Sequence, residues 1–183
     1  MVDGEIPQII IPMGPSTRVD SHRVKKAYKK SNEETRFLLS GGEGYREKTR
    51  LNLMTYPLIE QGIDEERIIL NNHKGSYAHI FNDFIDRINE FPLTGISTNP
   101  IGFKRFQLYM NAAKREGLIK RNKKIIGLNS LEYITNPFGF LVEIGGLKKD
   151  MRYFSGSFSK GLEEKYQETR KRLFGKDSRK LGI

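Results

Sequence analysis

Short apolar runs alternate with amphipathic segments along most of the chain. Five runs rich in β-branched or aliphatic residues predict strands, because each is short and ends at glycine or at a polar loop. These runs cover residues 8–14, 36–40, 67–70, 93–97 and 124–127. The first run contains Ile9, Ile10 and Ile11 in succession and is predicted to be the central strand.

Between these runs, apolar residues recur at the spacing of amphipathic helices. The predicted helices span about 21–31, 47–61, 76–90, 102–116 and 162–174. Asp20 or Ser21 is the expected cap of the first helix. Pro57 lies inside the second helix and predicts either a kink or a restart near Thr55.

Residues 133–158 carry signals for both kinds of element. Asn136 followed by Pro137 is typical of a helix start. The stretch from Phe140 to Ile144 alternates in part and ends in two glycines, which suits a strand. We favour a helix here.

The alternation of strands and helices predicts a three-layer α/β/α, Rossmann-like domain with a mostly parallel sheet of about five strands. We expect this domain to cover residues 1–158. Residues 159–183 are expected to form a basic helix and tail, packed on the domain or extending from it. Such folds bind ligands at the carboxyl ends of their strands.

Glycines, hydroxyl residues and cations follow several of the predicted strands at that edge. Glycine lets a ligand approach the backbone, whose N–H groups can bind an anion, and arginine binds phosphate or carboxylate through two hydrogen bonds. The alternative is that the glycines only make tight turns and the cations are solvated. The candidate ligand-binding residues are Gly14, Arg18, Ser40, Gly41, Gly42, Ser76, Ser97, Thr98, Asn99, Lys104 and Arg105.

Signals for catalysis are fewer. Glu43 and Glu47 are candidate catalytic carboxylates that could act as a general base or accept hydrogen bonds from a ligand. The chain has no Walker loop, dinucleotide fingerprint or nucleophile elbow. It has no cysteine, and its three histidines, His22, His73 and His79, lack the spacing of metal ligands, so no metal site is predicted.

The order of these motifs resembles the SanA/YdcF/ElyC family. Residues 9–14 with Arg18 match its first strand and arginine, and residues 37–42 match its strand ending in Ser-Gly-Gly. A third motif matches residues 61–70, with Ser76 at a position where the family has threonine. The last motif resembles residues 96–98, followed by Lys104 or Arg105 at the place of its arginine.

The resemblance covers residues 8–127 and implies a Rossmann-like domain with a pocket above residues 40–42. Glu47, with Glu43 as the alternative, stands at the family's acidic position. Some relatives are associated with S-adenosylmethionine, which is therefore a candidate cofactor. The family's histidine has no counterpart among residues 99–102. The resemblance therefore implies binding of a ligand more strongly than catalysis.

Composition adds a second class of partner. The chain has 32 Lys and Arg against 22 Asp and Glu, a net charge of +10. This favours a small anionic or nucleotide-like ligand, or nucleic acid bound through the basic segments 170–172 and 179–180. A scaffold that has kept the fold and lost the chemistry is the third alternative. No apolar window approaches the length of a membrane span and no signal peptide is recognisable, so we expect a cytoplasmic protein without a membrane partner.

Overall fold

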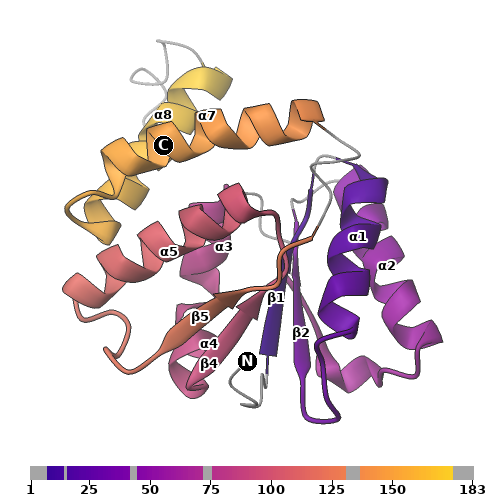
Figure 1. Ribbon diagram of the computed structural model, residues 1–183. Helices are drawn as coiled ribbons and strands as arrows, with labels where there is room; N and C mark the ends of the chain where they lie inside the picture. The colour runs from indigo at the N-terminus through magenta and orange to yellow at the C-terminus, as the bar shows by residue number, and fades with distance from the viewer. Residues whose placement is uncertain (1–7, 15, 42–44, 72–75, 131–136, 175–183) are drawn as a thin grey trace.

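The computed structural model describes residues 8–14, 16–41, 45–71, 76–130 and 137–174. Its centre is a sheet of five parallel strands in the order β3-β2-β1-β4-β5 (Figure 1). This confirms the predicted fold class and the central position of the first strand. The strands are β1 (Gln8–Pro12), β2 (Arg36–Ser40), β3 (Ile68–Asn71), β4 (Leu93–Ile96) and β5 (Lys124–Gly127).

Helices cover both faces of the sheet (Figure 1). Helices α1 and α2 pack on one face, and α3, α4 and α5 on the other. Two further helices, α7 and α8, follow β5. The helices are α1 (Thr17–Tyr28), α2 (Tyr45–Glu60), α3 (Tyr77–Asp83), α4 (Ile85–Glu90), α5 (Pro100–Arg115), α7 (Pro137–Tyr153) and α8 (Phe158–Phe174), with a short 3-10 helix, η1 (Glu65–Arg67), before β3.

The alternation of side chains along β1 explains the two cores. Ile9 and Ile11 point to the face covered by α1 and α2, while Ile10 points to the face covered by α3 and α5. All three are fully buried. A strand that is apolar on both faces is what a central parallel strand requires.

Several helix boundaries differ from the predictions. Helix α8 begins at Phe158 rather than at residue 162. Helix α1 begins at Thr17 rather than near residue 21, because the Ser16 side chain accepts a hydrogen bond from the backbone N–H of Val19. The region 76–90 forms two helices instead of one. The backbone N–H of Phe84 bonds to the carbonyl of Phe81, three residues back, and this tighter turn ends α3.

Helix α2 runs through Pro57 as one continuous helix, so the restart expected near Thr55 is wrong. Its inner face buries Leu51, Met54 and Leu58. The helix favoured for residues 133–158 is confirmed by α7. Among the described residues, no helix is long and apolar enough to cross a membrane.

Helix α7 crosses above the carboxyl ends of the strands (Figure 1). It packs against α5 and against α8. The strand order reverses between β1 and β4, which both end beneath this helix, so α7 lies over the topological switch point. The helix that was hardest to predict therefore covers the edge where Rossmann-like folds bind ligands.

Candidate functional site

A cavity of about 270 Å³ lies at the carboxyl edge of the sheet. Its walls come from the ends of β1 and β2 and from α3 and α5. Four of the predicted ligand-binding residues line it, namely Gly14, Gly41, Ser76 and Arg105. The other lining residues are Met13, Tyr77 and Ile80. Segments that are far apart in the chain thus meet where the sequence places the ligand.

The loop after β1 is held by an internal ion pair. The backbone N–H of Gly14 donates to Asp20 Oδ1 at 2.6 Å, and its carbonyl accepts from Arg50 Nη2 at 2.6 Å. Arg50 Nη2 also contacts Asp20 Oδ2 at 2.5 Å. A Cβ at Gly14 would lie 2.2 Å from Val19 Cγ1, so only glycine fits here. The N–H of Gly14 is therefore used to fix the loop and does not face a ligand.

Burial raises the pKa of Asp20, while its hydrogen bonds from Gly14 and Arg50 act in the opposite direction. The prediction that Asp20 or Ser21 caps this helix is wrong, because Ser16 is the cap, and Asp20 instead braces the preceding loop from the first turn of α1. This role depends on Arg50, which lies 30 residues further along the chain.

The loop after β2 is only partly described. The N–H of Gly41 donates to the carbonyl of Asn71 at 3.2 Å, and a Cβ at Gly41 would lie 2.2 Å from Met13 Cε. Ser40 is buried, and its hydroxyl has no hydrogen-bond partner in the part of the chain that the structure describes. Gly42 and Glu43 lie outside the described residues, and Glu47 lies in α2 with its side chain not described.

Arg105 is the cation on the cavity wall. Its side chain comes from α5, is 9% exposed, and lies with its guanidinium carbon 4.5 Å from the centre of the Tyr77 ring. Its Nε donates to Asp150 Oδ2 at 2.6 Å. A Cβ at Gly146 would lie 2.8 Å from Arg105 Nη1, so the guanidinium packs closely under α7. Arg105 also interacts with the buried hydroxyl of Tyr109.

The charge of Arg105 is secured by its neighbours. Burial acts to lower its pKa, but the phenol of Tyr109 and the carboxylate of Asp150 raise it above the ordinary value. The side chain is thus a permanent cation in a buried position, and a guanidinium on the wall of a cavity is suited to binding an anion.

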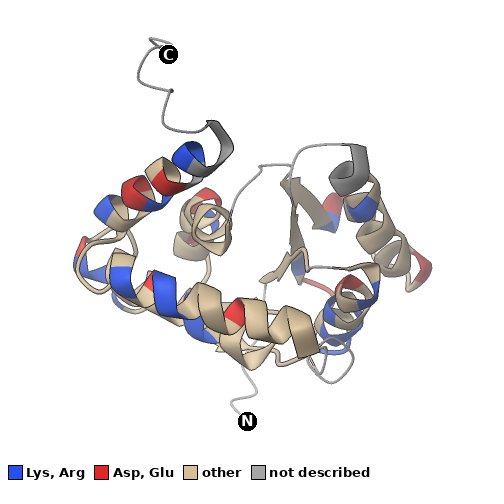
Figure 2. Ribbon diagram, turned by 90° about the horizontal axis from the view of Figure 1, so that it is seen from above, with Lys and Arg blue, Asp and Glu red and all other residues tan. Residues whose placement is uncertain are grey.

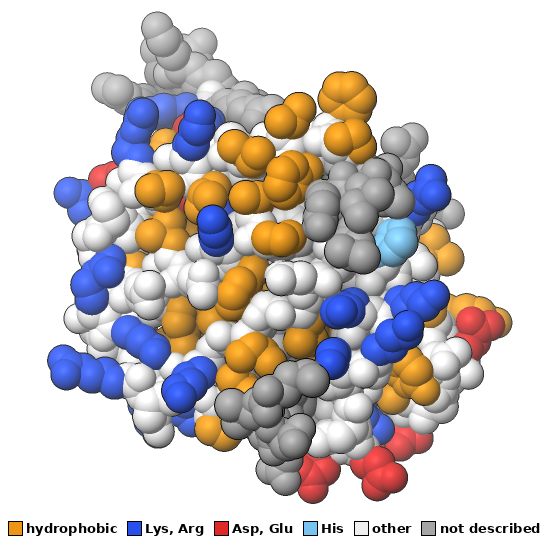
Figure 3. Space-filling model, in the orientation of Figure 1, with side chains coloured by type: hydrophobic (Ala, Val, Ile, Leu, Met, Phe, Trp, Pro, Cys, Tyr) orange, Lys and Arg blue, Asp and Glu red, His pale blue; other side chains and the backbone are white. Residues whose placement is uncertain are grey.

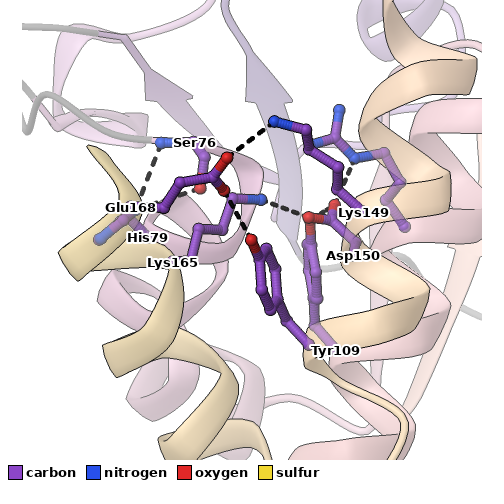
Figure 4. Close-up of polar contacts among 9 residues, drawn as sticks. Ser76, His79, Tyr109, Lys149, Asp150, Lys165 and Glu168 are labelled. Carbon is purple, nitrogen blue, oxygen red and sulfur yellow. Dashed lines mark hydrogen bonds and ion pairs between the residues drawn. The ribbon is translucent and has the colours of Figure 1, made fainter. Parts of the chain in front are cut away.

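Asp150 pairs with both Arg105 and Lys165, and Figure 4 shows it between Lys165 and the side chains of α7. This fully buried carboxylate from α7 also accepts hydrogen bonds from the Tyr109 hydroxyl and from Lys165 Nζ of α8. Burial lowers the pKa of Lys165, against the opposite effect of Asp150. Beside this cluster, Glu168 accepts from Lys149 Nζ at 2.9 Å. These contacts tie α7 and α8 to α5.

A second buried pair fixes α7 over the switch point. Arg23 of α1 is fully buried and donates from Nη1 to the carbonyl of Pro12 at 2.8 Å and from Nη2 to Glu143 Oε1 at 3.1 Å. The Tyr77 hydroxyl donates to the same oxygen at 2.8 Å. Glu143 Oε2 has no partner within the described ranges.

The pattern could have revealed Arg23 but not Glu143. Arg23 stands four residues after Val19 and four before Ala27, both on the buried face of α1, so helical spacing places it inside. Glu143 could be placed only once residues 137–153 were known to be helical. Both residues were missed, as was Asp150.

The predicted residues after β4 serve the local backbone. The Ser97 hydroxyl donates to the carbonyl of Arg23 at 2.5 Å, and Asn99 caps α5 by accepting from the N–H of Gly102 at 2.8 Å. Thr98 is fully buried. None of the three lines the cavity. Arg18 and Lys104 are exposed on α1 and α5 and do not line it either.

Metal binding has no support among the residues that are described. Within them, no group of three or more His, Asp or Glu side chains is placed to hold an ion. His79 lies near Ser76, with Nδ1 3.1 Å from the Ser76 hydroxyl at the start of α3 (Figure 4). His73 lies outside the described residues.

The buried tyrosines predict a loss of stability at alkaline pH. Burial raises the pKa of Tyr77 to about 12, from an ordinary value of 10. The native state therefore keeps a proton that the unfolded chain loses between pH 10 and 12, so stability falls as pH rises through this window. Relative to Tyr77→Phe, the wild type should lose about 3 kcal/mol across it. Urea denaturation at a series of pH values measures this difference.

Tyr56, which is exposed on α2, supplies the control for this experiment. Tyr56→Phe should keep the pH dependence of the wild type. A wild type and a Tyr77→Phe variant with parallel profiles above pH 10 would show that the Tyr77 phenol is not protected by burial.

Comparison of the chain with known proteins found no matching family model, no matching curated protein and no matching solved structure. The fold is therefore established by the strand order and the alternation of strands with helices. Membership of the SanA/YdcF/ElyC family stays a prediction.

Proposed function

We propose that this protein binds a small anionic ligand, nucleotide-like or phosphorylated, in the cavity at the carboxyl edge of the sheet. The observation that carries this proposal is Arg105, a buried and permanently charged guanidinium on the cavity wall. A buried cation is costly unless it is paired, and Arg105 shares the carboxylate of Asp150 with Lys165. An anion bound to the guanidinium would add a second counter-charge beside the two cations.

The size of the cavity limits the ligand. At about 270 Å³ it is at the lower end of small-molecule pockets, so it suits one anionic group with a compact attached moiety. S-adenosylmethionine, whose carboxylate could bind Arg105, remains a candidate through the resemblance to the SanA/YdcF/ElyC family. Glu43 and Glu47 stay the candidate catalytic residues for any turnover of the ligand, and their side chains are not described.

The cavity favours this proposal over a scaffold without a ligand, because such a scaffold would fill the space with its own side chains. The nucleic-acid alternative has no such local support. Lys and Arg side chains are scattered over the face seen in Figure 3. In the ribbon of Figure 2, Lys and Arg positions occur on helices on both sides of the molecule. It stays a prediction from the net charge of +10.

Arg105→Lys tests the anion contact. The lysine keeps a positive charge beside Asp150 but removes the paired nitrogens of the guanidinium. A hydrogen bond to a charged group contributes about 1.5–3 kcal/mol, so the affinity should fall about tenfold to a hundredfold. Thermal-shift screening with phosphate, nucleotides, sugar nucleotides and S-adenosylmethionine identifies the ligand, and isothermal titration calorimetry measures the loss.

Arg18→Lys is the matched control, since Arg18 is exposed and does not line the cavity. It should leave the affinity unchanged. If no compound stabilises the wild type, or if both variants weaken binding equally, the proposed site is wrong. Urea denaturation of both variants without ligand separates loss of binding from loss of folding.

A further inference from the structure

The outward face of α7 is apolar at one end and cationic at the other. Phe138, Leu141 and Val142 are 80%, 62% and 75% exposed, and their spacing of three and four residues places them on one face. Hydrophobic side chains gather along the top of the molecule over this helix (Figure 3). Lys148 and Arg152 continue the same face toward the end of the helix and are also exposed.

Among the described residues of α7, no exposed side chain is acidic. The acidic residues of α7 are Glu143 and Asp150, and both are buried against cations of the domain. Figure 2 shows the change along the helix, from a first turn without charge to a last part rich in Lys and Arg. The surface therefore combines protruding apolar side chains with a positive charge that no exposed acid of α7 offsets.

We propose that this face of α7 docks on an anionic lipid bilayer. Helices that lie in the plane of a membrane surface bury large apolar side chains among the acyl chains and place Lys or Arg among anionic headgroups. Phe138, Leu141 and Val142 would insert, and Lys148 and Arg152 would contact the headgroups. The net charge of +10 adds attraction at long range.

The form of the face favours a bilayer over a protein partner. Its three large side chains protrude from a convex helix, and a fluid bilayer accepts them without a complementary groove. A second copy packed with its α7 parallel would bring the same cations together, and one packed antiparallel would place its cations on the apolar end of the first. A helix of 17 residues is about 25 Å long, so α7 would lie on the membrane and not span it. The sequence predicts no membrane-spanning helix, and a helix that docks on the membrane surface does not need one.

Vesicle flotation with the full chain tests the proposal. The wild type should bind vesicles of phosphatidylcholine mixed with phosphatidylglycerol in equal parts, and not vesicles of phosphatidylcholine alone. Replacing Phe138, Leu141 and Val142 together by serine should weaken binding at least about tenfold, since each buried apolar side chain contributes to insertion. The control replaces three exposed apolar residues of α2 by serine, Leu53, Tyr56 and Ile59, and should bind like the wild type.

The cationic end has its own matched pair of variants. Lys148→Gln with Arg152→Gln should weaken binding about tenfold, because each cation near an anionic surface adds to affinity. Lys29→Gln with Lys30→Gln removes the same charge from exposed positions after α1 and should have little effect. Equal losses in both variants would show attraction through net charge alone and would overturn the proposed face.

Tryptophan fluorescence reports insertion directly, because the chain contains no tryptophan. The emission of a Val142→Trp variant should shift to shorter wavelength when anionic vesicles are added, and that of Leu53→Trp should not. An unshifted Val142→Trp, or serine variants of α7 that bind vesicles like the wild type, would overturn the proposal. So would a dimer in solution that the α7 serine variant dissociates, because the face would then join two copies.

Discussion

Asp150→Ala is expected to lower the free energy of unfolding by about 3–5 kcal/mol, the usual effect of removing one partner from a buried ion pair. The carboxylate is fully buried and accepts hydrogen bonds from Arg105, Tyr109 and Lys165 (Figure 4). Without it, Arg105 and Lys165 would lie close together after losing the carboxylate that they share. Urea denaturation followed by far-ultraviolet circular dichroism measures the loss.

Two further variants make this result specific. Asp150→Asn keeps the volume and one acceptor oxygen, so its loss of stability should be smaller than that of the alanine variant. Asp86→Ala removes an exposed carboxylate from α4 and should change stability by less than about 0.5 kcal/mol. If Asp150→Ala were no more destabilising than Asp86→Ala, the cluster beneath α7 would not stabilise the domain.

The proposed ligand allows a second test of the cluster formed by Arg105, Asp150 and Lys165, through its effect on the stability of an Asp150 variant. An anion on Arg105 would supply negative charge beside Lys165 and Asp150. Because a ligand that binds only the folded state stabilises it, the compound found by screening should recover part of the loss in Asp150→Asn. Ligand binding and the packing of α7 are thus linked through one guanidinium.

The fold could be predicted because each strand and most helices have a recognisable pattern of apolar residues in their own short stretch of sequence. The strands at Ile9, Phe37 and Ile125 are short apolar runs that end in glycine or polar residues, and the helices between them carry regular apolar spacing. Parallel strands joined through helices leave few topologies. The break at Phe84 was missed because an apolar residue that continues the helical pattern gives no sign of a tighter turn.

The site could be predicted only in outline. The glycine loops were placed at the correct edge, because the direction of the strands determines where their ends lie. The N–H of Gly14, however, bonds to Asp20, and that of Gly41 bonds to Asn71, so neither is available to an anion. These hydrogen-bond partners depend on how the strands and helices pack against one another. The apolar periodicity of a single strand or helix carries no information about that packing.

The acidic residues of α7 show the same limit more clearly. Glu143 and Asp150 are buried because α7 crosses the carboxyl edge of the sheet, an arrangement that depends on the whole fold. Arg105, in contrast, was named as a candidate from its place after β4. The sequence named Lys104 as an equal candidate. Only the structure shows that Arg105 is buried on the cavity wall and that Lys104 is exposed.

The pair of Arg23 and Glu143 should show strong energetic coupling. Arg23→Met alone leaves a buried carboxylate whose remaining described donor is the Tyr77 hydroxyl, and Glu143→Leu alone leaves a buried guanidinium. Each single variant should lose about 3 kcal/mol or more. The double variant replaces the pair by apolar side chains of similar size, so it should be more stable than the worse single variant, with a coupling energy of about 2 kcal/mol.

Arg87 and Glu90 provide a matched control cycle. Their charged groups lie 3.0 Å apart, close to the 3.1 Å of the buried pair, but both side chains are at least 40% exposed. Solvent screens such a pair, so its coupling should stay below about 0.5 kcal/mol. Additive effects in the buried cycle would mean that Arg23 and Glu143 do not hold α7 over the switch point. If the coupling energy is large for Arg23 and Glu143 and small for Arg87 and Glu90, burial explains the difference, because the two pairs have similar N–O distances.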